Sequence, residues 1–309
     1  MIISTPPVSG VIFLDKPLGW TSRKAVNEMV RLFSEPGKKR IKAGHGGTLD
    51  PLATGMLPIL LGEATRYAEL GLNAEKAYRV TFDLSYQTDT LDREGEVTVR
   101  FDGDVTTETL QALLPAFIGE LDQVPPVYSA IRIDGKRAHD MARKGEIVEM
   151  KSRKITIQTL TLVSFEYPLV TLEVSCSKGT YIRSLARDIG KSLGLGGCVT
   201  ELRRLSTGGW PQQMMVTIEQ LHEQKEGCLL PLASWLRNLS RLEISIDEAK
   251  RFLNGQRLQL KSTSDDESER DVAVFEGQTL LGTGTVKAGL KHMVLHPVRI
   301  LPSAQEIYR

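Results

Sequence analysis

The sequence lacks the cysteine pattern of a zinc site or of a disulfide-stapled protein. It contains three cysteines, Cys176, Cys198 and Cys228, and no Cys-x-x-Cys pair. A Cys-rich zinc site is therefore not expected, and an odd number of widely spaced cysteines argues against a secreted disulfide framework. The glycine spacing matches neither a phosphate-binding P-loop nor a dinucleotide fingerprint.

Long hydrophobic runs are also missing. No window approaches the roughly 18 consecutive apolar residues of a membrane-spanning helix. The first residues, MIISTPPVSGVIFLDKP, have no basic region and only one short apolar run, GVIFL. We therefore expect a soluble, cytoplasmic protein without a membrane segment.

Net charge is nearly absent, since 39 Lys and Arg oppose 38 Asp and Glu. This balance excludes a bulk polycation but not a local basic face. Residues 1–50, 130–155 and 178–204 each carry a net charge of +4, whereas residues 83–122 carry −8. Three basic blocks around one acidic block suit a protein that places a polyanion on one face, although ordinary solvated surfaces would give the same pattern.

The length of 309 residues predicts roughly two domains, and a hydrophobic content of 41% is ordinary for a globular chain. The residue patterns predict a strand that ends at a Pro turn in 10–17, a strand at 77–86 and a strand that runs into a turn in 170–181. They also predict helices at 21–33, 106–121 and 182–197, the last ended by glycines, and a basic, glycine-rich loop at 34–47. The pattern changes over residues 241–309, which combine a short helix, a polar loop at 261–271 and β-rich runs between glycines. We expect a main domain over residues 1–240 and a small, mostly β domain over 241–309.

The segment most suggestive of chemistry is GHGGTLDPLATGMLPILLGEATR, residues 44–66. Within it Asp50 precedes Pro51, which pushes the Asp50 backbone towards the extended region. A carboxylate in a tight glycine-rich turn is held in one orientation, as a nucleophile or general base requires. Asp before Pro is also a common turn residue, so these residues alone leave both interpretations open.

This segment closely resembles the nucleophile motif of the bacterial tRNA pseudouridine-55 synthases, the TruB family. Other segments resemble the same family in the same order: DKPLGWTS at 15–22, AYRVTFDL at 77–84, TDTLDREG at 88–95, CSKGTYIRSLARDIG at 176–190 and ELRRLSTG at 201–208. The resemblance covers nearly the whole chain. It implies an α+β pseudouridine synthase fold, with a central mixed, largely antiparallel sheet flanked by helices. It also implies a PUA-like RNA-binding β-barrel at 241–309.

The family isomerises the uridine at position 55 in the T-loop of tRNA to pseudouridine, without metal or other cofactor. Its one essential carboxylate falls on Asp50, which either attacks the substrate or removes a ribose proton. Both routes need an ionised carboxylate that is oriented and largely shielded from water. A buried anion needs a cationic partner, and the arginine of the family falls on Arg183, so we expect an Asp50–Arg183 pair. Arg183 could otherwise be a surface cation, but a cation at a helix start opposes the helix dipole.

The target base must leave its stack, so the resemblance also implies a pocket for a flipped uracil. Tyr78 matches the stacking tyrosine of the family, and Tyr181 and Leu202 match further pocket residues. On residue type alone, Tyr78 could equally be a strand aromatic and Leu202 a core leucine. His45 matches a histidine that helps to arrange the flipped nucleotide.

Outside the pocket, Lys16 and Pro17 match a Lys-Pro motif that we interpret as structural support. The basic segment near 124–154 matches an insertion that closes over the T-loop, where its cations would contact phosphates. The implied partner is the T-arm of tRNA, and nothing in the sequence demands a dimer, so we expect a monomer. Three positions depart from the family pattern, namely Gly46, Ser85 and His139, and none of them removes a proposed catalytic group.

Two alternatives stay open at this point. A guide-RNA-dependent synthase of the dyskerin type shares this core but works within a multi-protein particle. An RNA-binding folding factor with a secondary or inactive isomerase site would use the same basic blocks. Activity on tRNA without a guide, and the effect of changing Asp50, distinguish them.

Overall fold

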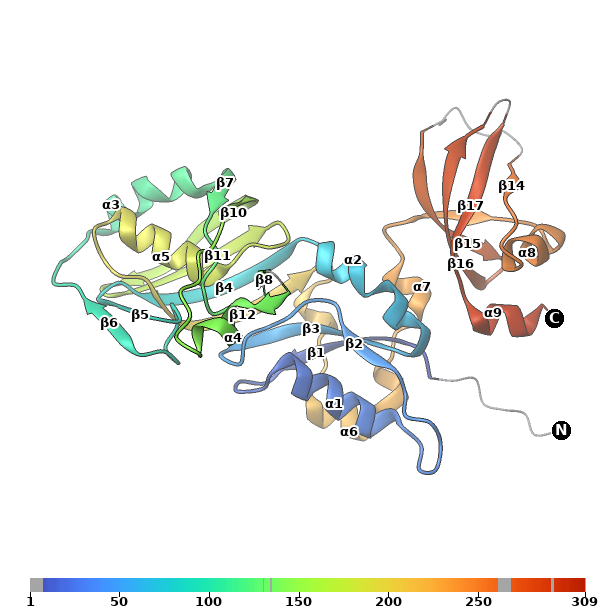
Figure 1. Cartoon of the computed structure of the whole chain (residues 1–309), viewed down its shortest axis with the longest axis horizontal. Coiled ribbons are helices and arrows are strands. Elements are labelled where there is room, and N and C mark those ends of the chain that lie inside the picture. Colours follow the sequence, from blue (N-terminus) through green and yellow to red (C-terminus); the bar gives the residue numbers. More distant parts are fainter. Residues whose placement is uncertain (1–7, 130, 134, 261–267, 290–291, 309) are drawn as a thin grey trace.

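The computed structural model describes residues 8–129, 131–133, 135–260, 268–289 and 292–308. Its largest feature is a central eight-stranded sheet with the order β1-β3-β12-β4-β11-β10-β7, in which β2 also pairs with β3 (Figure 1). Only the β3–β12 pair is parallel; the other pairs in this sheet are antiparallel. The prediction of a mixed, largely antiparallel sheet is therefore confirmed. The strands are β1 (Gly10–Lys16), β2 (Ala43–His45), β3 (Ala53–Leu61), β4 (Lys76–Asp83), β7 (Gly119–Gln123), β10 (Arg153–Glu166), β11 (Leu169–Cys176) and β12 (Cys198–Thr207).

Helices pack against this sheet, and the local sequence marks where the first of them begins. Thr21 caps the first helix, because its side chain accepts a hydrogen bond from the Lys24 N–H. The α-helices described in this part of the chain are α1 (Ser22–Phe33), α2 (Ala68–Asn73), α3 (Thr107–Leu113), α4 (Ala138–Ala142), α5 (Ile182–Ser192), α6 (Ile218–Gln224) and α7 (Leu232–Trp235). Two short hairpins complete it, β5 (Tyr86–Thr88) with β6 (Val97–Arg100), and β8 (Arg132–Ile133) with β9 (Lys136–Arg137).

Two element predictions were wrong in part. The helix predicted at 106–121 stops at Leu113, because Pro115 cannot continue the α-helical hydrogen bonding, and Gly119 at φ +102° starts strand β7 instead. The loop predicted at 34–47 contains strand β2, whose residues pair with the end of β3. A three-residue strand carries too little periodicity to be read from sequence, and long-range pairing forms it.

The chain ends in a second, five-stranded sheet with the order β13-β15-β16-β17-β14 (Figure 1). Its strands are β13 (Ser240–Glu243), β14 (Leu258–Gln259), β15 (Arg270–Glu276), β16 (Thr279–Ala288) and β17 (Met293–Ile300), accompanied by helices α8 (Ile246–Leu253) and α9 (Pro302–Ile307). The β-rich runs expected here are present. Residues 261–267 of the predicted polar loop lie outside the described residues.

The two sheets share a hydrophobic core. Along β1, Ile12 and Leu14 belong to the core on one face, whereas Val11 and Phe13 point to the other face. The Phe13 ring lies 4.8 Å from the Trp210 ring, centroid to centroid, in a core that continues to residues of the C-terminal sheet. Strands β1 and β3 are therefore buried on both faces, which gives the loop between β2 and β3 a rigid base.

Candidate active site

The loop that carries Asp50 joins β2 to β3. Hydrogen bonds to its main chain hold it in place on both sides of Asp50. The Ser22 hydroxyl accepts a hydrogen bond from the Leu49 N–H at 2.8 Å and donates one to the Leu49 carbonyl at 3.0 Å. On the other side, the Pro51 carbonyl accepts from the Gly19 N–H at 2.9 Å. These contacts fix the backbone at Asp50 without using its carboxylate.

Lys16 lies beneath the same loop and is fully buried. Its ammonium donates to the carbonyls of Trp20 at 2.6 Å, Pro17 at 3.0 Å and Pro51 at 3.4 Å. Lys16 thus ties the turn that follows β1 to the residue after Asp50. Pro17 contributes its carbonyl to this arrangement and lies outside the cavity beside Asp50.

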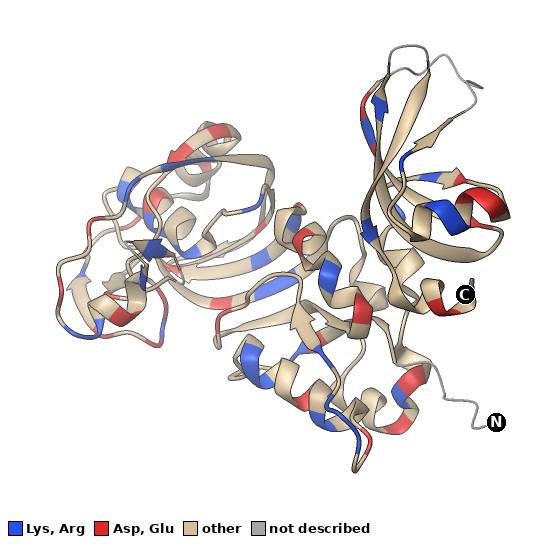
Figure 2. Ribbon diagram, turned by 45° about the vertical axis from the view of Figure 1, so that its right-hand side comes forward, with Lys and Arg blue, Asp and Glu red and all other residues tan. Residues whose placement is uncertain are grey.

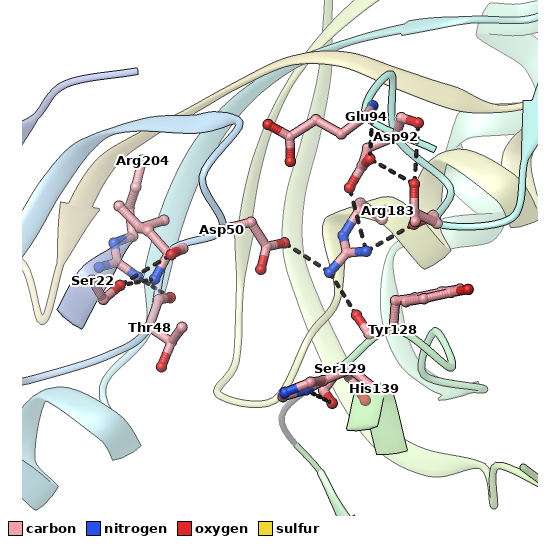
Figure 3. Close-up of polar contacts among 12 residues, drawn as sticks. Ser22, Thr48, Asp50, Asp92, Glu94, Tyr128, Ser129, His139, Arg183 and Arg204 are labelled. Atoms are coloured by element: carbon pink, nitrogen blue, oxygen red, sulfur yellow. Dashed lines mark hydrogen bonds and ion pairs between the residues drawn. The ribbon is translucent and has the colours of Figure 1, made fainter. Parts of the chain in front are cut away.

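The expected ion pair between Asp50 and Arg183 is present (Figure 3). Nη2 of Arg183 lies 2.8 Å from Oδ2 of Asp50, and the arginine side chain is 6% exposed whereas that of Asp50 is 37% exposed. The sequence-based expectation that Asp50 is largely shielded from water is therefore only partly correct. The carboxylate is oriented by a buried cation but still reaches solvent.

Arg183 is itself held by several groups from distant parts of the chain. Its Nη1 lies 3.4 Å from Oδ2 of the buried Asp92 and donates to the Thr90 carbonyl at 2.8 Å. Its Nη2 also donates to the Tyr128 carbonyl at 3.1 Å. These acceptors offset the cost of placing a cation in the first turn of α5, where the helix dipole opposes it.

The surroundings of Arg183 carry more negative than positive charge. Asp92 accepts hydrogen bonds from the Thr90 hydroxyl at 2.7 Å and the Glu94 N–H at 3.1 Å, so its carboxylate is fixed (Figure 3). Burial, and then the charges of Asp92 and Asp50, raise the pKa of Glu94. Arg183 is thus the cation around which three carboxyl groups are arranged.

A cavity of about 290 Å³ opens beside this ion pair. Five of the predicted site residues line it: Asp50, Tyr78, Tyr181, Arg183 and Leu202. Tyr78 comes from β4 and Leu202 from β12, two neighbouring strands of the central sheet. Burial raises the pKa of the Tyr78 hydroxyl, so this ring stays neutral and presents an aromatic wall.

Hydrogen bonds to its main-chain groups fix the position of Tyr181. The side-chain amide of the buried Gln123 accepts from the Tyr181 N–H at 2.8 Å and donates to the Tyr181 carbonyl at 3.1 Å. Burial raises the pKa of the Tyr181 hydroxyl. Because Tyr181 immediately precedes α5, the same contact also positions the start of the helix that carries Arg183.

His45 does not line this cavity. It is the last residue of β2, half-buried, and its Nδ1 accepts from the Gly47 N–H at 3.4 Å. Burial, with the nearby cations Arg204 and Arg23, lowers the pKa of His45. A neutral imidazole is therefore expected near neutral pH.

The insertion near 124–154 reaches the cavity through Ser129, which lines it. His139, one of the departures from the family pattern, lies with its Nδ1 2.7 Å from the Ser129 carbonyl. Exposed cations of this insertion include Arg132, Lys136 and Lys144. Figure 2 shows further Lys and Arg residues along α1 and the loop after it.

Three residues at the site were missed by sequence reasoning. Asp92 lies in the segment TDTLDREG, which carries part of the family resemblance, but no role was assigned to Asp92 itself. Arg204 is two residues beyond Leu202 on the same strand, so the two share a face, and that alternation could have revealed it. Lys76 lines the cavity and donates to three carbonyls, those of Gly71, Leu72 and Ala74.

The described part of the chain contains no group of three or more His, Cys, Asp or Glu residues that could hold a metal ion. Among the same residues, no helix has the length and apolar character needed to cross a membrane.

Replacing Lys16 by methionine is expected to remove a pH dependence of stability. Burial, opposed by the charges of Asp50 and Glu94, lowers the pKa of Lys16 from 10.5 to about 8. Between about pH 8 and pH 10.5, the unfolded chain binds more protons at this group than the folded protein does. The free energy of unfolding of the wild type should therefore rise with pH, by up to about 1.4 kcal/mol per pH unit from this group. Urea unfolding of both proteins on either side of about pH 8 measures this. A difference between them that does not change with pH contradicts it.

Comparison with known proteins identifies the family. Residues 35–182 match the TruB family pseudouridylate synthase N-terminal domain, and residues 183–239 match the tRNA pseudouridylate synthase B C-terminal domain. The chain is 42% identical to tRNA pseudouridine synthase B of Ralstonia pickettii strain 12J, over 95% of this chain and 94% of the relative. It is 44% identical to the protein of the same name from Zymomonas mobilis, over 82% of this chain and 86% of the relative.

Solved structures show the same fold. The chain superposes on one from a Cbf5-Nop10-Gar1 complex with a TM-score of 0.73 and 26% identity, covering 97% of this chain and 86% of that one. A chain from an H/ACA RNP bound to a substrate RNA gives a TM-score of 0.69 and 25% identity, covering 94% and 84%. The chain therefore belongs to the TruB family of tRNA pseudouridine synthases, isomerases that convert uridine in tRNA to pseudouridine.

Proposed function

We propose that this enzyme acts on uridine 55 in the T-loop of tRNA, with Asp50 as its essential carboxylate and without a cofactor. The observation that carries the proposal is the Asp50–Arg183 pair at 2.8 Å, on the edge of a cavity walled by Tyr78, Tyr181 and Leu202. A carboxylate held beside a buried guanidinium stays ionised and oriented. The cavity offers the flipped base an aromatic and apolar surface.

The reaction moves the glycosidic bond from N1 to C5 of the uracil ring. The bond between the ribose C1′ and N1 breaks and its electron pair goes to the base, which turns so that C5 bonds to C1′. C5 then loses its proton and N1 gains one, so the reaction is balanced without an oxidant or reductant. Asp50 takes part either by attacking the sugar or by removing a ribose proton, and an oriented, ionised carboxylate serves both routes.

Each remaining residue has a proposed part in holding the substrate. Tyr78 stacks on the flipped uracil, Tyr181 and Leu202 close its pocket, and His45 arranges the nucleotide. Arg183 holds Asp50 in place. Because the Asp50 side chain is 37% exposed, the arriving RNA must complete its shielding from water.

The wider RNA surface is also part of the proposal. Cations of the insertion, including the exposed Lys136 and Lys144, would contact phosphates of the T-arm. Residues 241–309 would form a PUA-like RNA-binding domain, separate from a catalytic domain at 1–240, and would reach another part of the tRNA. Their five-stranded sheet supports this assignment. A tRNA substrate is consistent with action in the cytoplasm, and the monomeric state remains a prediction.

We favour a stand-alone enzyme over a guide-dependent one. The curated relatives that are 42% and 44% identical are tRNA pseudouridine synthases, whereas the chains from the Cbf5-Nop10-Gar1 complex and the H/ACA RNP are 26% and 25% identical. Isomerisation of naked tRNA, without a guide RNA or a second protein, distinguishes the two possibilities.

Replacing Asp50 by asparagine should abolish turnover while tRNA binding persists, because the amide keeps the shape of the side chain but loses its charge and nucleophilicity. The assay is tritium release from unmodified tRNA that carries C5-labelled uridine only at position 55, without metal, nucleotide or guide. Asp122→Asn, an exposed carboxylate paired with Lys154, is the matched control and should react like the wild type. Turnover by Asp50→Asn would sink the proposal, and so would a wild type that releases tritium from uniformly labelled tRNA but none from tRNA labelled only at position 55.

Replacing Tyr78 by alanine should slow the isomerisation more than it weakens tRNA binding. The ring contributes after the base has left its stack, and base–aromatic stacking is worth about 1–3 kcal/mol. Single-turnover rates at saturating tRNA, compared with filter-binding Kd values, separate the two effects. An equal loss in both would show that Tyr78 does not act at the flipped stage.

A further inference from the structure

Arg204 is a buried cation of the site that the mechanism above does not use. It is 1% exposed and is the largest fully buried side chain among the described residues. On β12 it pairs with Tyr78 of β4 on one side and with Gly55 of β3 on the other. Its position therefore lies between the strand that carries the proposed stacking tyrosine and the strand that follows Asp50.

The guanidinium group of Arg204 binds the loop that carries Asp50 and the strand that follows this loop. Its Nη2 donates to the Gly47 carbonyl at 3.1 Å and its Nη1 to the Thr48 carbonyl at 3.3 Å, just before Asp50. Its Nε donates to the Met56 carbonyl at 2.6 Å, just after the turn. These acceptors are main-chain carbonyls, so the contacts set the shape of the loop rather than balance a charge.

The neighbouring backbone is built to admit this arrangement. Gly55 has φ +92°, and a Cβ atom at Gly55 would lie 2.2 Å from the Arg204 carbonyl oxygen. Only glycine permits so close an approach of β3 to β12. Because the two strands lie this close, the Arg204 side chain passes beneath the loop and reaches carbonyls on both of its sides.

Arg204 also contacts the wall of the cavity. It lines the cavity together with Asp50 and Tyr78, and on the neighbouring strands β12 and β4 it is paired directly with Tyr78. Arg204 is thus a neighbour both of the loop of the proposed nucleophile and of the proposed stacking residue. The distance between the carboxylate and the base depends on both.

We propose that Arg204 is a positioning residue, which sets the carboxylate of Asp50 against the base held by Tyr78. The inference rests on the proposed function, since it concerns the geometry of that reaction. Ser22 and Lys16 hold the loop at Leu49 and Pro51 independently, and the pairing with β1 holds Met56. Loss of Arg204 therefore frees the main chain at Gly47 and Thr48 while the rest stays anchored. A shift of about 1 Å at a reacting group costs about 100-fold in rate, without an equal effect on binding.

A lysine cannot replace this group. The guanidinium is a planar fork whose donors point at three separate carbonyls, whereas an ammonium is a compact point charge on a flexible stem. Arg204→Lys keeps the charge and removes the fork. It therefore separates the effect of geometry from that of electrostatics.

The test compares Arg204→Ala and Arg204→Lys with Arg203→Ala. Arg203 is the preceding residue of β12 and pairs with Asp15 at 2.7 and 2.9 Å, outside the cavity, so it is the matched control. For each protein we would measure the single-turnover rate on saturating tRNA, the tRNA Kd, and the fraction able to bind tRNA. Rates are expressed per binding-competent molecule, so a partly folded variant remains informative.

The expected result is a rate about 100-fold lower for Arg204→Ala, a lysine variant close to it, and Kd values within about 3-fold of the wild type. Added guanidinium chloride, at concentrations well below those that unfold the protein, should restore much of the rate of Arg204→Ala, whereas equal sodium chloride should not. A lysine variant as fast as the wild type, a rate that falls only in step with binding, or the absence of specific rescue would overturn the inference. An inactive wild type would overturn the proposed function instead.

Discussion

The site depends on the buried guanidinium of Arg183. One planar group meets the carboxylates of Asp50 and Asp92 and the carbonyls of Thr90 and Tyr128. These partners come from the β2–β3 loop, the turn between β5 and β6, and the start of the insertion near 124–154. A cation buried to this extent is stable only when such acceptors surround it, so its position forces three distant segments to meet at one point.

The loop of Asp50 is stabilised by a different kind of contact. Ser22, Lys16 and Arg204 bind its main chain, and no contact among them uses the Asp50 carboxylate. The backbone is therefore rigid, while the side chain has a single strong partner in Arg183 and stays open to the cavity. Such an arrangement keeps a carboxylate ionised and oriented and leaves one face of it free to react.

The sequence predicted those features that depend on local patterns or on long motifs. The glycine-rich turn singled out Asp50. A short apolar run before a Pro turn predicted β1, and strand alternation predicted β4, with small errors at their ends. The ion pair with Arg183 followed from a physical need for a counter-cation together with the family resemblance. The C-terminal β-rich segment was visible from its glycine-separated runs.

Features formed by long-range packing were not predicted. Strand β2 exists because β3 offers it a pairing edge, and the helix that begins at Thr107 is cut short where Pro115 interrupts it. Arg204 falls in the basic block 178–204 and Asp92 in the acidic block 83–122, and no local pattern indicates that either is buried. The close approach of Gly55 to β12 places Arg204 under the loop, and Asp92 meets a partner 91 positions away.

The most direct test of this account is the single-turnover rate of Arg183→Lys on saturating tRNA. A lysine keeps the positive charge but cannot reach Asp50, Asp92 and the two carbonyls together. The account predicts a rate at least about 100-fold below that of the wild type, with tRNA affinity little changed. A rate within about 3-fold of the wild type would contradict the claim that the geometry of this guanidinium, and not its charge alone, prepares Asp50 for the reaction.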